Sequence, residues 1–499
     1  MWSGDECTDE GADAKRYSSL WSIFLMKDKR ENHKSWIIAS PSSPKVARVS
    51  SPVRCGMVLD FAVAVVEVVD AAHPGDTGPL ETWLEANPLA EVLCILGKTE
   101  GNGCVNDYTR GYATSAIKDA LRRVQRRRIE RASDNMRRTH PELYDGMEDA
   151  AIIMSGGTEG EHSPENRSAL NFVFHLAPIH SPPPAGVLCP HFIVFAKSYD
   201  EKDADKVAPK DKDARLELFV TRTEDFKPEE VGTQEMVKET KRAILECMRF
   251  SAGMDYDSLL GSDEIFVQIK CPLLTPERVA EAAARGQTCA TTDSYKSMAL
   301  SRGASTIGAA LAIETLRGDL LPKSTRKIAI CEDYKYYSDR VSSSAGVELM
   351  HCEILVMVRT NGPLTRALDT IPGVLNTYKS KFQMACGRMD DAIDFAGVMK
   401  CVDEARGPSG TNEIVTAIVK ADPAASVRGR RTTMLSDSDI NATRHSRAAV
   451  GGVVAAAVGD CRVYVSGGAE HQGPDGGGPV CVISRVRTPG SEEGTKRKR

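Results

Sequence analysis

The sequence predicts an α/β fold of three structurally similar domains around a pseudo-threefold axis, with a central active site. One phrase, serine followed by a small residue, glycine, any residue and glutamate, occurs three times, beginning at Ser155, Ser344 and Ser466. The length of 499 residues also corresponds to about three domains of ~150 residues each. Because the repeat is far longer than a solenoid unit, it indicates whole domains rather than a stack of short repeats.

A short apolar run that ends in lysine precedes each of these serines. The three lysines are Lys98, Lys270 and Lys420. Apolar runs of this length are typical of buried strands. Each serine phrase follows a second apolar run or leads into one, so we expect a strand, a tight turn and a further strand around each serine.

An arginine lies between the lysine and the serine of each repeat, at the start of a helix rich in small residues. These arginines are Arg110, Arg302 and Arg447. Arg444 is a rival to Arg447, but matching Ser446-Arg447-Ala448 to Ser301-Arg302-Gly303 favours Arg447. Each repeat therefore supplies one Lys, one Arg and one Ser.

The repeat spacing predicts the limits of the domains. We expect a disordered extension at 1–55, domains at 56–205, 212–362 and 363–488, and a charged tail at 489–499. In the first domain, residues 161–186 separate the serine phrase from the strand that follows it. They are interpreted as an inserted surface loop or as a translated piece of non-coding sequence.

Composition excludes several classes of protein. A content of 41% hydrophobic and 27% charged residues is ordinary for a globular protein. The 14 cysteines are dispersed without a Cys-x-x-Cys pair, which favours reduced thiols and a cytoplasmic location. The most apolar window, 57–72, is interrupted by acidic residues, so no membrane association is expected. The net charge of -5 gives no reason to expect nucleic acid, and the basic run 122–138 is interpreted as a solvated helix face.

Three sets of Lys, Arg and Ser around one cavity predict nucleophilic chemistry on a carbonyl. A serine becomes a good nucleophile when a base accepts its proton, and a neutral lysine can be that base. Burial and neighbouring positive charges both lower the pKa of a lysine. The arginines and the turn amides would then donate to a developing oxyanion. Donors with pseudo-threefold symmetry suit a planar ring that has several carbonyl groups.

Several longer runs closely resemble the ring-opening cyclic amide hydrolases, the family of cyanuric acid hydrolase and barbiturase. They are residues 97–111, 155–160, 285–303, 429–431, 436–445 and 466–474. The resemblance covers roughly residues 56–488. It implies hydrolysis of a small cyclic imide, either cyanuric acid to carboxybiuret or barbituric acid to ureidomalonate, by a homotetramer that needs no cofactor for catalysis.

The resemblance also implies roles for individual residues. Lys270 would be the base and Ser344 the nucleophile, with the adjacent Ser343 left open as an alternative. The substrate would be bound by the other members of the three sets and their neighbours: Lys98, Arg110, Ser155, Gly156, Arg302, Ser343, Ala345, Lys420, Arg447, Ser466 and Gly467.

A structural divalent cation in the third domain is a further implication of the resemblance. Oxygen ligands suit Mg²⁺ or Ca²⁺. The implied ligands are Asp422, Ala469, Gln472, Gly473, Pro474 and Gly477, with Glu470 as an alternative carboxylate to Asp422. A loop that binds no ion is the alternative interpretation.

Two other hypotheses stay open. An amidohydrolase that activates water with a metal would need clustered His and Asp ligands, and the sequence has no His-x-His motif. The other is an inactive family member, or a mispredicted gene product whose insertion disrupts the first domain. Its inactivity would have to come from folding, because all three sets of Lys, Arg and Ser are present.

Overall fold

The computed structural model describes residues 63–101, 103, 105, 107–139, 141–156, 187–199, 215–251, 264–319, 327–360, 382–433 and 442–486. The chain divides into two units, Met1–Gly56 and Met57–Arg499, and all described residues belong to the second. The predicted extension 1–55, the segment 161–186 and the tail 489–499 lie outside the described residues.

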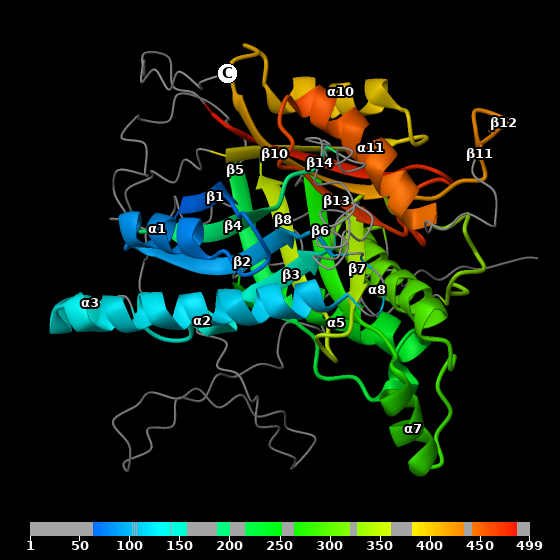
Figure 1. Ribbon diagram of the computed structural model, residues 1–499, viewed down its shortest axis with the longest axis horizontal. Coiled ribbons are helices and arrows are strands. Elements are labelled where there is room, and N and C mark those ends of the chain that lie inside the picture. Colours follow the sequence, from blue (N-terminus) through cyan, green and yellow to red (C-terminus); the bar gives the residue numbers. More distant parts are fainter. Residues whose placement is uncertain are drawn as a thin grey trace, which may run out of the picture. The chain divides into compact units, whose positions relative to one another are not determined.

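Three sheets of four strands carry the repeat. The first orders its strands β1-β4-β2-β3, the second β5-β8-β6-β7, and the third β9-β14-β10-β13. In the strand orders just given, the first and second strands are antiparallel, and so are the second and third. The third strand carries the lysine and pairs in parallel with the fourth, which carries the serine. The order of elements, β-α-β-α-β-β, is therefore repeated three times along the chain (Figure 1).

The elements of the first repeat are β1 (Val63–Asp70), α1 (Gly78–Ala86), β2 (Ala90–Lys98), α2 (Tyr108–Arg131), α3 (Asp134–Thr139), the 3-10 turns η1 (Pro141–Leu143) and η2 (Met147–Asp149), β3 (Ala151–Ser155) and β4 (His191–Ser198). Those of the second are β5 (Arg215–Arg222), η3 (Pro228–Glu230), α5 (Gln234–Ser251), β6 (Glu264–Pro272), α7 (Pro276–Ala284), α8 (Ser294–Leu316), β7 (Val341–Gly346) and β8 (Glu353–Thr360). Those of the third are β9 (Phe382–Met389), α10 (Phe395–Ala405), β10 (Glu413–Ala421), β11 (Ser426–Val427), β12 (Arg430–Arg431), α11 (Ala442–Val458), β13 (Tyr464–Gly467) and β14 (Gly478–Arg485).

Each sheet buries both of its faces. On one face it packs against its own helices: α1 and α2 in the first repeat, α5 and α8 in the second, α10 and α11 in the third (Figure 1). On the other face, apolar side chains of all three sheets form one shared cluster that includes Phe195, Phe266 and Tyr464. Burial on both faces explains why the strands read as nearly continuous apolar runs.

The sequence located the lysine-bearing strands correctly as β2, β6 and β10. The prediction that each arginine opens its helix is wrong for Arg302 and Arg447, because α8 already begins at Ser294 and α11 at Ala442. The Asp293 side chain caps α8 by accepting a hydrogen bond from the backbone N–H of Lys296 at 2.8 Å, and this cap moves the start of the helix upstream.

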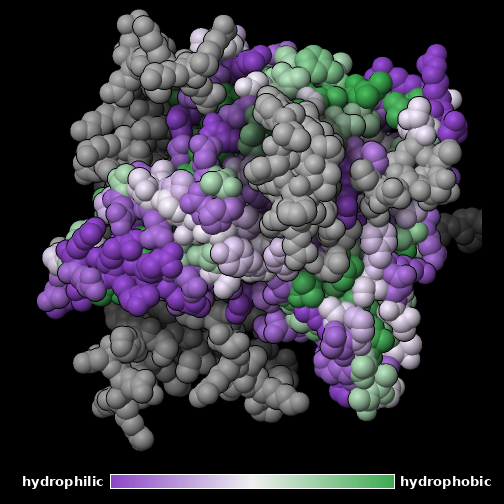
Figure 2. Space-filling model, in the orientation of Figure 1, coloured by the Kyte–Doolittle hydropathy of each residue, from purple (hydrophilic) through white to green (hydrophobic). Residues whose placement is uncertain are grey.

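The basic run 122–138 lies on α2 and α3, where Figure 2 shows a predominantly hydrophilic surface. Arg123 and Arg127 form ion pairs of 2.6 and 2.7 Å with Glu81 of α1. The side chains that this run presents are thus partly paired within the first repeat. Among the described residues, no helix is both long enough and apolar enough to cross a membrane.

Candidate active site

Each lysine of the repeat lies directly opposite its serine on the neighbouring parallel strand. The paired residues are Lys98 with Ser155, Lys270 with Ser344, and Lys420 with Ser466. Residues in register on adjacent strands project to the same face of a sheet. The tertiary structure therefore forms three Lys/Ser pairs from residues that are far apart in sequence.

The three lysines connect the repeats in a ring. Each buried Nζ donates to the carbonyl just before the serine of another repeat: Lys98 to Val465 at 2.6 Å, Lys270 to Met154 at 2.7 Å, and Lys420 to Ser343 at 2.7 Å. The first repeat thus reaches the third, the third reaches the second, and the second reaches the first. This cyclic pattern is that of a pseudo-threefold axis passing between the three serine strands.

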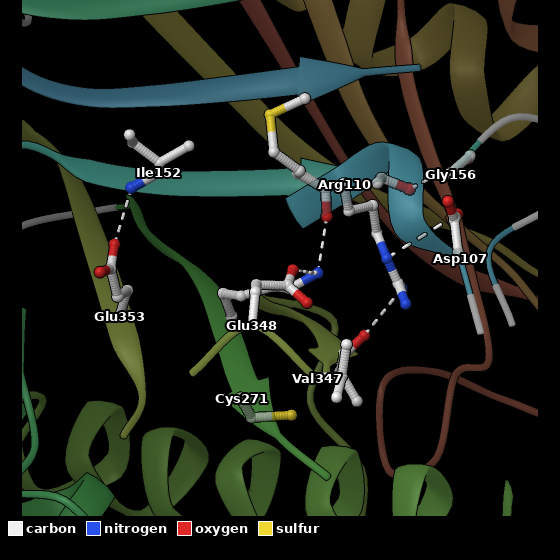
Figure 3. A network of polar contacts seen from close by, with 12 residues as sticks. Asp107, Arg110, Ile152, Gly156, Cys271, Val347, Glu348 and Glu353 are labelled. Carbon is white, nitrogen blue, oxygen red and sulfur yellow. Dashed lines mark hydrogen bonds and ion pairs between the residues drawn. The ribbon is translucent and has the colours of Figure 1, made fainter. Parts of the chain in front are cut away.

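The second contact of the lysines breaks this symmetry. Lys98 also donates to the carbonyl of Gly156 at 2.5 Å, and Lys420 to the equivalent carbonyl of Gly467 at 3.2 Å. In the second repeat, the equivalent carbonyl of Ala345 accepts instead from Arg110 Nη1 at 3.1 Å. Lys270 forms an ion pair of 2.8 Å with Glu348, and Figure 3 shows Glu348 and Arg110 within one network of polar contacts.

Burial and charge shift the pKa values of these groups. Burial lowers the pKa of Lys270; Glu348 partly offsets this effect, and Arg110 adds to it. Burial also lowers the pKa of Lys420 well below its usual value, with Arg302 acting in the same direction. Burial alone would raise the pKa of Glu348, but the charges of Lys270 and Arg110 lower it to about 2. At neutral pH Glu348 is therefore ionised beside a lysine that loses its proton more readily than a free one.

A cavity that opens to solvent lies at the serine side of the three pairs. Its wall contains Ser155, Ser344 and Ser466, the three predicted arginines, and the predicted neighbours Gly156, Ala345 and Gly467. The three lysines are buried and are not among the residues of the wall. Arg444 lines the cavity together with Arg447, so the two rivals named from the sequence are both present at the site.

Two of the three arginines, Arg110 and Arg302, contact another repeat. Arg302 of the second repeat forms a bidentate pair with Glu470 of the third, with Nε and Nη2 at 2.7 and 2.6 Å from the carboxylate. Burial acts to lower the pKa of Arg302, but Glu470 raises it. Gly468 has a φ of +79°, and a Cβ there would lie 2.5 Å from Arg302 Nη2. The second glycine of this phrase thus leaves room for the guanidinium group.

The two adjacent serines of the second repeat face opposite sides of β7. Ser344 lines the cavity. The Ser343 hydroxyl instead lies 2.8 Å from the hydroxyl of Ser305 on α8, and the Ser343 backbone N–H donates to Gln472 Oε1 at 2.7 Å. Of the two candidates, only Ser344 lines the cavity.

Tyr464 is a residue of the site that the sequence analysis missed. It aligns with Ile153 and Ser342, two positions before the serine of each repeat, and it is buried in the shared core. Its hydroxyl adjoins those of Ser344 and Ser155, although no contact reaches normal hydrogen-bond geometry. Burial raises the pKa of Tyr464, so its hydroxyl keeps its proton at neutral pH. A large aromatic residue at one of three equivalent positions was the signal that the sequence offered.

Asp107 is a second residue that the sequence analysis missed, although an aspartate at the equivalent helix start occurs in two of the repeats. Asp107 caps α2 as Asp293 caps α8. One Asp107 oxygen accepts from the backbone N–H of Gly103 at 2.7 Å, and the same oxygen lies 3.8 Å from Arg110 Nε. The cap thereby fixes both the loop at the rim of the cavity and the start of the helix that carries Arg110. Further wall residues that the sequence did not indicate are Gly103, Met154, Tyr295, Met298 and Thr443.

The loop with the implied cation ligands folds tightly after β13. The N–H of Gln472 donates to the carbonyl of Ala469 at 2.8 Å, and that of Gly477 to the carbonyl of Pro474 at 2.9 Å. Gly473, with a φ of +139°, lies between these two turns. The loop is compact, and its backbone oxygens come from one short stretch of chain.

Asp422 is the carboxylate beside this loop that no arginine holds in the described part of the chain. Burial raises its pKa; the N–H of Gly476, 3.2 Å away, opposes the rise and nearby Glu470 adds to it. Glu470, by contrast, is committed to Arg302. Within the described residues, no three His, Cys, Asp or Glu side chains are grouped so as to hold a metal, so any ion here would depend mainly on backbone and amide oxygens.

Comparisons with known proteins agree with this geometry. A family model described as amidohydrolase ring-opening protein matches residues 65–169 and 175–485. The match therefore extends into the segment 161–186 that repeat spacing marked as an insertion. The cyanuric acid amidohydrolase of Pseudomonas sp. strain ADP is 39% identical over 421 residues, which cover 83% of this chain and 96% of that protein. The enzyme of that name from Enterobacter cloacae is 38% identical over 430 residues.

Solved structures show the same fold. The crystal structure of the A. caulinodans cyanuric acid hydrolase matches with a TM-score of 0.62 and 34% identity, covering 85% of this chain and all of that one. Another cyanuric acid hydrolase structure matches with a TM-score of 0.63 and 36% identity. The predicted α/β fold of three similar domains is thereby confirmed. The extent of the family match and the identity to these relatives show that this chain belongs to the family of ring-opening amidohydrolases.

Proposed function

We propose that this protein opens the ring of cyanuric acid by hydrolysing one C–N bond, with Ser344 as the nucleophile and Lys270 as the base. The observation that carries the proposal is one cavity whose wall contains three serines and three arginines in a cyclic arrangement. Cyanuric acid is a planar ring with three carbonyl groups at equal angles. A donor set with the same symmetry can contact every carbonyl at once, and the relatives named above carry this activity in their names.

The reaction would begin with transfer of the Ser344 proton to neutral Lys270. The buried position of Lys270 lowers its pKa and so favours the neutral amine. Ser344 Oγ then attacks a ring carbonyl, and the other two serines with the three arginines hold the remaining carbonyls in place. Orientation by several fixed donors converts binding into rate, because the reacting atoms meet in one geometry.

The choice of Ser344 over Ser466 rests on its surroundings. Its partner lysine contacts a carboxylate at 2.8 Å, whereas Lys420 contacts backbone carbonyls of Ser343 and Gly467. Ser343 is the weaker candidate because its hydroxyl contacts Ser305 on α8 and not the cavity.

A structural cation beside the third repeat is part of the proposal. The buried Asp422 carboxylate has a raised pKa and a negative neighbour in Glu470, so a divalent cation would relieve local repulsion. Asp422 would hold it with oxygens of Ala469, Gln472, Gly473, Pro474 and Gly477. Gln472 Oε1 accepts a hydrogen bond from Ser343, so an ion bound there would also steady β7, the strand of the proposed nucleophile.

The test is ring opening of cyanuric acid and of barbituric acid, measured in parallel with the purified full-length chain. We expect turnover of cyanuric acid, lost in Ser344→Ala and retained in Ser343→Ala. Turnover of barbituric acid alone would replace cyanuric acid as the substrate within the same family chemistry. Turnover of neither by folded protein would overturn the proposal. Homotetramer formation and a cytoplasmic location belong to the same proposal, and light scattering would test the former.

A further inference from the structure

The glutamate of the serine phrase has different partners in the second and third repeats. Glu348 and Glu470 occupy equivalent positions, four residues after Ser344 and Ser466. Glu470 pairs with Arg302 at 2.6 Å, while Glu348 pairs with Lys270 at 2.8 Å. The first-repeat equivalent, Glu159, lies outside the described residues. The same sequence element thus supports an arginine in one repeat and a lysine in another.

We propose that Glu348 is a positioning residue that holds Lys270 against Ser344 and stabilises the ammonium ion formed when Lys270 accepts the Ser344 proton. This inference rests on the proposed function. Glu348 does not touch the substrate. Its charge would explain part of the difference in reactivity between the Lys270/Ser344 pair and the Lys420/Ser466 pair.

A glycine at the end of β7 leaves room for the Glu348 carboxylate. Gly346 ends β7, and a Cβ at that position would lie 2.2 Å from a Glu348 carboxylate oxygen. A side chain at residue 346 would therefore displace the carboxylate from Lys270. The side chain of Glu348 is 7% exposed and that of Lys270 is fully buried, so water screens their interaction little.

Other charged and titratable groups also approach the pair. Arg110 on α2 lowers the pKa of both Lys270 and Glu348, and Cys271 adjoins Lys270 on β6. Arg278 on α7 interacts with Glu348 through its charge and donates to the carbonyl of Val347 at 2.8 Å. Tyr464 on β13 approaches from the Ser344 side. Figure 3 shows Arg110, Cys271, Val347 and Glu348 around this point.

Every proton transferred in the proposed reaction is accounted for while Glu348 stays ionised. Ser344 Oγ–H gives its proton to Lys270 Nζ as the Oγ–C bond forms, and the ammonium ion returns that proton to the ring nitrogen as the C–N bond breaks. A water molecule then gives a proton to Lys270 while its oxygen attacks the acyl carbon. Lys270 finally protonates Ser344 Oγ as it departs. The positive charge on Lys270 appears twice, and each time it lies beside the carboxylate.

The experiment compares Glu348→Gln with the matched variant Glu470→Gln, using the full chain and cyanuric acid. Gln keeps the shape and an acceptor for Lys270 but removes the charge. We expect kcat of Glu348→Gln to fall about 100-fold with KM changed less than about threefold, as for loss of a transition-state interaction. The acidic limb of the kcat/KM profile should move to lower pH, because loss of the anion makes Lys270 easier to deprotonate. Glu470→Gln should leave that limb in place.

A second variant guards against a fold defect. Glu348→Asp keeps the charge at a shorter reach, so its acidic limb should stay at the wild-type position even if kcat falls. The inference is overturned if Glu348→Gln keeps kcat within about threefold of wild type, if its acidic limb does not move, or if the Glu348→Asp limb moves equally far. An inactive wild-type protein would instead overturn both the proposed function and this inference. Failure of the inference alone, with an active wild-type protein, is therefore distinguishable from failure of the proposed function.

Discussion

The second and third repeats use one sequence phrase for two electrostatic purposes. In the third, Glu470 fixes the guanidinium of Arg302 at the cavity wall, and Lys420 contacts backbone carbonyls. In the second, Glu348 contacts Lys270 itself, and Arg110 donates a hydrogen bond to the carbonyl of Ala345. A repeated motif therefore gives equal geometry but unequal charge around each lysine. Charge, rather than residue type, is what can make one of the pairs reactive.

The sharpest test of this comparison removes one serine at a time. Ser344→Ala should lower kcat by about 10⁴-fold or more, because the covalent step has no other nucleophile. Ser155→Ala and Ser466→Ala should cost only about 10- to 100-fold, since each removes one donor to the ring. Steady-state kinetics with cyanuric acid would measure all three. Equal losses in the three variants would mean that the repeats are not differentiated in the way proposed.

Removal of Arg302 should lower the stability of the protein, because Glu470 of the third repeat loses its partner. Arg302→Met leaves Glu470 buried without its bidentate partner, and breaking a buried pair in this way costs about 3–5 kcal/mol of stability. Urea unfolding monitored by circular dichroism would measure the loss. The matched variant Arg110→Met should cost less, because Glu348 keeps its contact with Lys270. A larger loss in Arg110→Met would contradict this assignment of partners.

Acid should weaken the contribution of Glu348 to stability. Its folded pKa is lowered to about 2 from an ordinary value of 4.5, so the stability it contributes is present above about pH 4.5 and is lost as the pH falls towards 2. The full effect is about 3 kcal/mol. Denaturant unfolding of wild type and Glu348→Gln between pH 6 and pH 3 would measure the part of this loss that falls above pH 3, with other carboxylates common to both proteins. The stability gap between them should narrow with acid; a constant gap would argue against the ion pair.

Tyr464 provides a smaller test of asymmetry at the axis. Its hydroxyl adjoins those of Ser344 and Ser155, so Tyr464→Phe removes one donor while keeping the buried ring. We expect kcat to fall about tenfold, as for loss of one polar hydroxyl beside the nucleophile, with the Tm nearly unchanged. Ser342→Ala is a suitable control, because it changes the equivalent position of the second repeat. A drop in Tm without a drop in kcat would assign Tyr464 to packing alone.

Chelation should have the smallest effect on chemistry. If a divalent cation binds beside Asp422, dialysis against EDTA should lower the Tm by a few degrees, since a ligand that binds only the folded state stabilises it by mass action. Differential scanning calorimetry with and without added Mg²⁺ or Ca²⁺ would detect the change. Asp422→Asn should remove the dependence on the added ion. An identical Tm under all conditions would favour a loop that binds no ion.

The strands and the lysines that they carry were predictable because their signal is local. Apolar runs that end in Lys98, Lys270 and Lys420 became the strands β2, β6 and β10. A strand that is buried on both faces must be apolar along most of its length, so it stands out in a single sequence. The threefold recurrence then predicted three domains and one central site, which pattern alone can indicate.

Only the tertiary structure decided which groups face which. The choice between Ser344 and Ser343 depends on which side of β7 meets α8, and a shift of one residue reverses the two faces. The partners of Glu348 and Glu470 come from strands and helices up to 168 residues away. The sequence determined the residues of the site and their repeated order. The docking of three sheets determined their charges and contacts, because those depend on burial and on neighbours that no local pattern specifies.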